Sequence, residues 1–542
     1  MKTIIAGAIG ECVHVAGVNN FLRLAELAGW RTIFLGPAVS IEKFLAVAKS
    51  EKAEMVGVSY RLTPETGERL LAEFAEAADE LRDSGVRFVF GGTPPVAEKA
   101  RKSGFFERVF SGHESDTDVL SFLKGENRDS IIKEIFPNKT IDRINWKAPF
   151  PLLRHHFGLP TMQSTLVGIE MIAKAQVLDV ISLGIDQDAQ ENFFHPERQD
   201  PRRKGAGGVP VRSEEDYSTL YQASRCGNFP LMRTYSGTDD FLKLAELTSN
   251  SINNAWCAIP LFWFNQMDGR GPWDLEGSIR EHQKVMRWYG EQGIPVELNE
   301  PHHWGMRDAP DIIFVVSAFL SAYNAKVFGV KDYIAQFMFN SPPETTDAMD
   351  LAKMITILKL IEPLQDDHFR IWRQTRTGLL SYPINPVSAK AHLATSVYLQ
   401  MALKPHIIHV VGFNEADHAA TAEDVIESCQ LAQTAIEKAL KGAPNFQNDE
   451  KIKSRVDHLL SEARFTLNTI RDLASSEGDP LVDPISLTQI VKYGILDAPH
   501  LKNNRFALGE IVTRIIDGAC KVVDEAGHPI SESKRIEKLM EG

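Results

Sequence analysis

Residues able to bind a metal or a flat ring follow the first apolar run of the chain. The apolar run from Lys2 to Ile9 is followed directly by Gly10, and His14 and Gly17 come shortly after it. A histidine nitrogen is a common metal ligand, and glycine lets a large group approach the backbone. Ligands of open α/β sheets bind at the carboxyl ends of the strands, so this loop is a candidate ligand site.

A second group of chemically capable residues lies in the middle of the chain. Arg233, Glu300 and Glu415 each follow a short apolar run. The carboxyl ends of strands build the active site of a (β/α)₈ barrel, so polar residues at such positions indicate function. Arginine binds carboxylates through two parallel hydrogen bonds, which makes Arg233 a candidate anion ligand.

The elements that must position the first site alternate regularly. Residues 1–125 contain five apolar strands separated by amphipathic helices, a pattern that predicts an open, doubly wound, flavodoxin-like parallel sheet. The expected strands are Lys2–Ile9, Arg31–Gly36, Met55–Tyr60, Arg87–Gly92 and Arg108–Ser111.

The rest of the chain predicts three further segments. Residues 126–159 are polar and then proline-punctuated, which indicates a connecting arm. Residues 160–444 predict a (β/α)₈ barrel with seven recognisable strands and an eighth that the pattern does not place. Met162–Val177 is expected to cover the base of the barrel. Residues 445–542 predict a mostly helical accessory region with an apolar helix around Leu508–Val523. The seven strands are Val180–Ile185, Pro230–Tyr235, Ala255–Phe262, Pro295–Asn299, Tyr333–Phe339, Phe369–Arg373 and His406–Gly412.

Bulk properties exclude several classes of function. The 542 residues carry a formal net charge of −13, which argues against nucleic acid or an anionic membrane as a partner. The sequence has neither a signal peptide nor an apolar run long enough to span a bilayer, so a cytoplasmic protein is expected. Its five cysteines are scattered, which argues against a disulfide framework, structural zinc or a cysteine-bound iron–sulfur cluster.

Three loop motifs resemble those of cobalamin-binding domains. The segment from Cys12 to Gly17 resembles the signature Asp-x-His-x-x-Gly, Ser59 begins a Ser-x-Leu-like motif, and Gly91-Gly92 ends the fourth strand. The resemblance implies that His14 is the lower axial ligand of cobalt. It also implies that the cofactor-binding residues are Cys12, His14, Gly17, Ser59, Gly91 and Gly92. Cysteine stands where the family has aspartate, and a thiol is a weak hydrogen-bond acceptor.

The barrel segment resembles the barrel chain of glutamate (methylaspartate) mutase. The resemblance rests on Tyr289–Gly305, on Arg233 with the following Gly-Thr pair, and on the Asn-Glu-Ala segment around Glu415. It implies that Glu300 binds the ammonium group of a substrate or accepts its proton, that Arg233 holds a carboxylate, and that Glu415 contacts the adenosyl ribose. A second family arginine is replaced near Gln187, and a family lysine is missing near Val411, so glutamate is only one candidate substrate.

Together, these resemblances imply an adenosylcobalamin-dependent carbon-skeleton mutase, an isomerase acting by a radical mechanism on a small amino or carboxylic acid. A homodimer is the family expectation. Two alternatives stay open. One is a corrinoid-dependent methyltransferase, disfavoured because no helical cap precedes the first strand. The other is a cobalamin-binding sensor or carrier with an inactive barrel.

Overall fold

The computed structural model describes residues 2–112, 114, 116–125, 136–473 and 478–541. The chain divides into two compact units, residues 1–135 and 136–542. Each unit is described by itself below.

The first unit is a five-stranded parallel sheet with strand order β2-β1-β3-β4-β5, as expected for a flavodoxin-like fold. Helices cover both faces of the sheet. Its elements are β1 (Thr3–Ile9), α1 (Ala16–Leu27), β2 (Arg31–Val39), α2 (Ile41–Ser50), β3 (Met55–Tyr60), α3 (Pro64–Asp83), β4 (Arg87–Gly92), α4 (Pro94–Ser103), β5 (Arg108–Phe110) and α5 (Asp116–Lys124).

Local sequence explains where these helices begin. The Ser40 hydroxyl accepts a hydrogen bond from the Lys43 amide and so caps α2. Pro64 and Pro94 occupy the first turns of α3 and α4, where the missing N–H of proline costs nothing. Each helix therefore starts just after a strand ends, which leaves the strand-end loops short and well defined.

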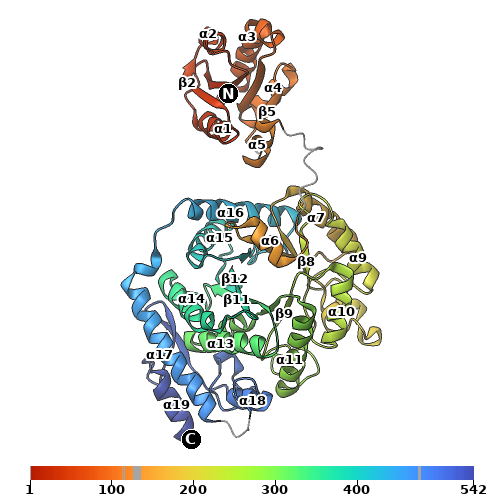
Figure 1. The fold of residues 1–542 in the computed structure, drawn as a ribbon, viewed down its shortest axis with the longest axis vertical. Helices are drawn as coiled ribbons and strands as arrows, with labels where there is room; N and C mark the ends of the chain where they lie inside the picture. Colours follow the sequence, from red (N-terminus) through yellow and green to blue (C-terminus); the bar gives the residue numbers. More distant parts are fainter. Residues whose placement is uncertain (1, 113, 115, 126–135, 474–477, 542) are drawn as a thin grey trace. The chain divides into compact units, whose positions relative to one another are not determined.

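The second unit is built around eight parallel strands in the order β8-β7-β6-β13-β12-β11-β10-β9. The Ala255 amide, two residues before the end strand β9, donates a hydrogen bond of 2.9 Å to the Met232 carbonyl in the other end strand, β8, which brings the sheet close to a closed barrel. Figure 1 shows the helices arranged as a ring around these strands. The strands are β6 (Leu152–Phe157), β7 (Val180–Leu183), β8 (Leu231–Arg233), β9 (Cys257–Ile259), β10 (Val296–Leu298), β11 (Asp332–Phe339), β12 (Arg370–Thr377) and β13 (Ile407–His409).

The helices of the barrel follow its strands in turn, as the (β/α)₈ pattern requires. They are α7 (Met162–Ala175), α8 (Gln187–Glu191), α9 (Glu214–Ala223), α10 (Phe241–Ile252), α11 (Leu275–Gln292), α12 (Glu300–Gly305), α13 (Asp311–Val327), α14 (Asp347–Ile361), α15 (Pro386–Gln400) and α16 (Ala422–Leu440), with α6 (Thr140–Lys147) before the first strand.

The eighth strand that the sequence pattern did not place is β6. It lies inside the segment predicted as a connecting arm, because the polar residues Arg154, His155 and His156 make it look like a loop. Pairing of β6 with β7 and β13 buries Arg154 and His155. The helix expected at the base of the barrel is instead α7, which connects β6 to β7 and packs beside α9 and α16.

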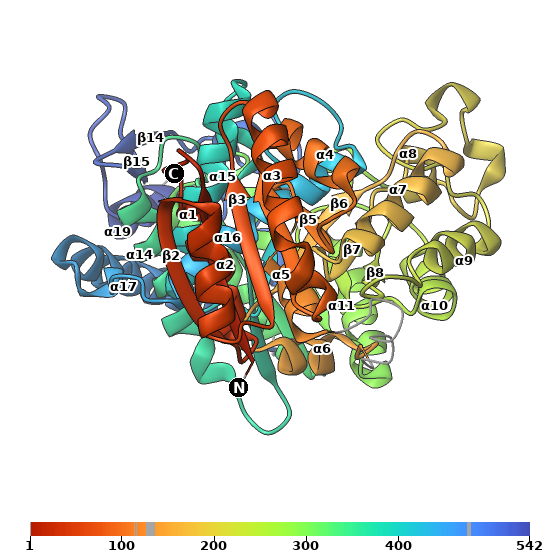
Figure 2. The same ribbon diagram turned by 90° about the horizontal axis from the view of Figure 1, so that it is seen from above.

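The C-terminal region is mostly helical, with α17 (Glu450–Asp472), α18 (Pro484–Lys492) and α19 (Glu532–Glu541). Figures 1 and 2 show α17 and α19 on the α14 side of the barrel, and α17 packs on α14. The prediction of an apolar helix around Leu508–Val523 is wrong. This segment forms the antiparallel hairpin β14 (Thr513–Ile516) and β15 (Ala519–Val522). Its two-residue Asp517-Gly518 turn has positive φ at both positions, a strong hairpin determinant.

None of the described helices is long and apolar enough to cross a bilayer.

Candidate functional site

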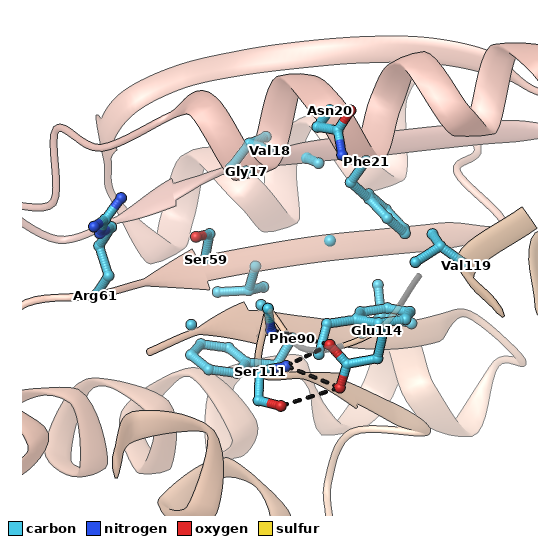
Figure 3. Close-up of a pocket in the computed structure, with 18 of the residues that line it drawn as sticks. Gly17, Val18, Asn20, Phe21, Ser59, Arg61, Phe90, Ser111, Glu114 and Val119 are labelled. Carbon is cyan, nitrogen blue, oxygen red and sulfur yellow. Dashed lines mark hydrogen bonds between the residues drawn. The ribbon is translucent and has the colours of Figure 1, made fainter. Parts of the chain in front are cut away.

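A cavity of about 380 Å³ lies at the carboxyl ends of the central strands of the first unit. Strands β1 and β3 are neighbours, while the connections that leave them run to opposite sides of the sheet, which opens a crevice there. Figure 3 shows α1 on one wall and the β4 and β5 ends on the other. Residues predicted from the sequence that line it are His14, Gly17, Ser59, Gly91 and Gly92.

Two glycines keep this cavity open. A Cβ atom built on Gly17 or on Gly91 would meet nothing within 4 Å, so a side chain at either position would enter the cavity. Gly92 has a different reason to be glycine, since its Cβ would lie 2.5 Å from the Tyr60 carbonyl oxygen. His14 lies at the cavity and is exposed to solvent. The arrangement leaves room for a large ligand beside an accessible imidazole.

The wall opposite α1 carries a carboxylate that the sequence reasoning missed. Glu114 accepts a hydrogen bond from the Ser111 amide at 2.9 Å (Figure 3). It also accepts one from the Gly112 amide at 3.0 Å. Partial burial raises the pKa of this carboxyl, but the backbone and Ser111 hydrogen bonds outweigh burial and lower it. The Ser111-Gly112 turn after β5 is a sequence signal that could have indicated this place.

The interior of the barrel holds a buried charge cluster around Glu297 on β10. Its Oε2 atom lies 3.2 Å from Arg154 Nη1 and 3.1 Å from Arg233 Nη1, and it accepts a hydrogen bond from Trp256 at 2.7 Å. Gln336 donates to the other carboxylate oxygen at 2.9 Å. Burial raises the pKa of Glu297, but the two guanidiniums dominate and hold it at about 2. Arg233 is thus already engaged by a carboxylate of the chain.

Glu300 lies three residues further on and has a different environment. Its carboxylate accepts hydrogen bonds from the Leu261 amide at 2.6 Å, the Phe262 amide at 3.0 Å and the Trp304 indole at 2.7 Å. Burial raises its pKa to about 7, although these N–H donors lower it. Glu300 therefore ties the loop after β9 to the start of α12, and its side chain is fully buried.

A pocket of about 470 Å³ opens at the carboxyl ends of the barrel strands. His156 and Tyr235 line it with stacked rings, 5.3 Å between centroids, and Glu415 stands exposed at its rim. Gly158 and Gly184 form part of its floor, and a Cβ on Gly158 would lie 2.0 Å from the Gly184 carbonyl oxygen. The close backbone approach of β6 and β7 makes this floor possible.

Comparison with known proteins identifies the first unit. A protein-family model described as the B12 binding domain matches residues 2–118. Glutamate mutase sigma subunit 1 of Haloarcula marismortui is 30% identical over 128 residues, which are 23% of this chain and 84% of that protein. The chain belongs to the B12-binding family.

Two further similarities lie in the same part of the chain. Trimethylamine corrinoid protein 1 of Methanosarcina mazei is 27% identical over 128 residues, 23% of this chain and 55% of that protein. The crystal structure of a cobalamin-binding protein from Desulfitobacterium hafniense matches 23% of this chain and 56% of its own, with 22% identity and a TM-score of 0.20. The chain therefore spans about half the length of the corrinoid relative. The B12-binding match lies within the first unit.

The residues of the B12-binding unit fit cobalamin. The space left by Gly17 and Gly91 suits a bulky, elongated group, and His14 is an accessible nitrogen ligand beside it. Cys12 behaves differently from expectation. Its side chain is fully buried in the core cluster with Ile9 and Phe44, and it does not line the cavity. The thiol is thus directed to packing and not to the ligand.

Proposed function

We propose that the protein is an adenosylcobalamin-dependent carbon-skeleton mutase that acts on a small amino or carboxylic acid. The observation that carries the proposal is the pairing of two parts in one chain. One is a B12-binding unit similar to a glutamate mutase sigma subunit, and the other is a barrel with a polar pocket at its carboxyl-terminal mouth.

In this proposal, the first unit holds the cofactor through residues that line its cavity. His14 would ligate cobalt, and Gly17, Ser59, Gly91 and Gly92 would surround the cofactor's nucleotide tail, since all of them line the cavity. When bound, adenosylcobalamin supplies a carbon-centred radical by homolysis of its cobalt–carbon bond. The exposed Glu415 at the barrel mouth remains the residue proposed to contact the adenosyl ribose.

In this proposal, the barrel residues bind and orient the substrate and exclude water from it. Arg233 and Glu300 make their contacts to the chain itself, so we propose them as positioning residues of the reaction chamber. Arg233 acts through Glu297, at 3.1 Å, and Glu300 acts through the loop of Leu261 and Phe262. A homodimer and a cytoplasmic location remain predictions from the sequence.

A corrinoid-dependent methyl transfer is the second candidate, favoured by the 27% identity to trimethylamine corrinoid protein 1. The two candidates differ in the upper ligand of cobalt, adenosyl or methyl. The bound cofactor of the protein purified in the dark distinguishes them directly by its visible spectrum and mass.

The function is tested by ultraviolet–visible spectroscopy of the full chain with adenosylcobalamin, followed by addition of amino and dicarboxylic acids. The mutase proposal expects histidine-ligated binding, loss of the adenosylcobalamin spectrum with one acid, and transfer of deuterium from that labelled acid into the adenosyl group. Cofactor binding without any acid-dependent change would instead favour a sensor or carrier. His14→Ala is the matched control for ligation.

A further inference from the structure

Positive charge exceeds negative charge inside the barrel. The guanidiniums of Arg154, Arg233 and Arg376 are all buried, with the three side chains at most 6% exposed. Arg154 and Arg233 share the single carboxylate of Glu297. Arg376 Nε donates to the Thr377 carbonyl at 3.4 Å, and no carboxylate of the described residues forms an ion pair with it. A buried cation without a counter-ion is costly, so Arg376 is a candidate ligand for an external anion.

Strand register places Arg376 at the level of the charge cluster. Arg376 on β12 pairs with His409 on β13, and His409 pairs with Arg154 on β6. The carboxylates whose charges act on Arg376 are Glu297, already shared by two arginines, and Glu415, exposed at the rim. The nearby imidazoles add no second positive charge, because burial and the arginines lower the pKa values of His156, His302 and His409.

The hydrogen bonds of the pocket also determine which groups can donate to a ligand. Arg154 is only a donor, so its 3.0 Å contact requires His156 Nε2 to accept. The neutral imidazole then carries its proton on Nδ1, which faces the Tyr235 hydroxyl oxygen at 3.3 Å. Tyr235 accepts this proton's hydrogen bond, and its own O–H remains for a ligand in the pocket. Ring contacts connect Tyr235 to the level of Arg376, since the His156 ring that stacks on Tyr235 also lies 4.9 Å from the ring of His409, the strand partner of Arg376.

We propose that Arg376 and Tyr235 bind a carboxylate group of the substrate, as an ionic anchor and a hydroxyl donor. The inference rests on the proposed function only in taking this pocket as the substrate site. It transfers the anion-binding role expected of Arg233 to Arg376, because Glu297 already engages Arg233. A substrate with at least one carboxylate would supply the counter-charge that the interior lacks.

The test is isothermal titration calorimetry of the full chain without cofactor. The probes are succinate, L-glutamate, inorganic phosphate and the uncharged succinamide. We expect at least one of the two acids to bind and succinamide not to bind. Because a charge-assisted hydrogen bond contributes more than a neutral one, Arg376→Gln should weaken binding about 10- to 100-fold and Tyr235→Phe about 3- to 10-fold. Arg376→Lys should retain part of the affinity.

Arg370→Gln is the matched control, since Arg370 is an exposed arginine on the same strand. It should bind like the wild type. The proposal is overturned if neither acid binds the wild type, if phosphate alone binds, or if Arg376→Gln and Tyr235→Phe bind the acids unchanged. If Arg376→Gln fails to fold, Tyr235→Phe, which removes one oxygen atom, decides the question. Cobalamin binding to each variant is measured separately, so loss of acid binding with normal cofactor spectra refutes this anchor without touching the B12-binding assignment.

Discussion

Replacing Glu297 by glutamine should destabilise the barrel strongly. The substitution keeps the shape of the side chain but removes the one carboxylate shared by Arg154 and Arg233. Breaking a buried ion pair by removing one partner costs about 3–5 kcal/mol, because the remaining charges stay buried without compensation. For a unit of roughly 400 residues, with an unfolding entropy of about 2.1 cal/mol/K per residue, this corresponds to a fall in Tm of about 4–6 °C.

Differential scanning calorimetry of the full chain at neutral pH measures this change in the transition of the second unit. Glu291→Gln is the control, since Glu291 is an exposed glutamate on the neighbouring helix α11. A second substitution, Arg233→Met in the Glu297→Gln background, should recover part of the loss, because it removes one of the two uncompensated cations.

The pH dependence gives a further check on Glu297. The pKa of Glu297 falls from its ordinary value of 4.5 to about 2 in the folded chain because of the two guanidiniums, so its ion pairs stabilise the fold fully above pH 4.5. This contribution is lost as the pH falls from 4.5 to 2, and the difference between wild type and Glu297→Gln should shrink over that window. A shift in Tm below 1 °C at neutral pH, or a difference that does not change with pH, would refute the reasoning.

Three further predictions follow from the same geometry. His14→Ala should abolish the nitrogen hyperfine coupling of bound cobalt(II) in electron paramagnetic resonance, and unchanged coupling would remove His14 from the site. Gly91→Leu should leave the first unit folded by circular dichroism but reduce cobalamin affinity at least 10-fold, because the side chain enters the cavity, whereas Glu76→Leu on the exposed face of α3 should bind normally. In the wild type, the free energy of unfolding of the barrel should fall by roughly 3 kcal/mol between pH 4.5 and 7, because Glu300 ionises in the unfolded chain before it ionises in the folded chain. Glu300→Gln should abolish this fall, which urea unfolding at a series of pH values measures. The same dependence of the unfolding free energy on pH in the variant would argue against the assignment.

Much of the fold follows from periodicity alone. Alternating apolar strands and amphipathic helices predicted the first unit and seven of the eight barrel strands, because parallel strands buried on both faces are short apolar runs and the helices between them bury one apolar face. The misses have a common cause. Strand β6 carries Arg154, His155 and His156, which only the closed barrel can bury and pair. The segment with β14 and β15 is apolar enough for a helix, and the Asp517-Gly518 turn alone distinguishes it.

The sequence predicted which residues line the candidate sites better than it predicted which side chains contact each other. The loop motifs led to His14, Gly17 and Gly91, and these residues do line one cavity. Cys12 has the right spacing, but the turn after β1, in which the Cys12 amide donates to the Ile9 carbonyl at 3.3 Å, directs its side chain into the core. No spacing rule could show that Arg233 meets Glu297 across the barrel, because they are 64 residues apart and β9 lies between their strands.

Glu297 and Glu300 show why the type of a residue does not determine its chemistry. Both are fully buried carboxyls within one strand–helix segment, and burial alone raises the pKa of each. Two guanidiniums reverse the shift for Glu297, whereas the uncharged N–H donors around Glu300 reduce it without reversing it. Glu297 therefore stays ionised and neutralises charge from two arginines, and no carboxylate in the part of the chain that the structure describes forms an ion pair with Arg376. The pKa contrast and the proposed substrate anchor thus have one origin, the number of arginines that surround a single carboxylate.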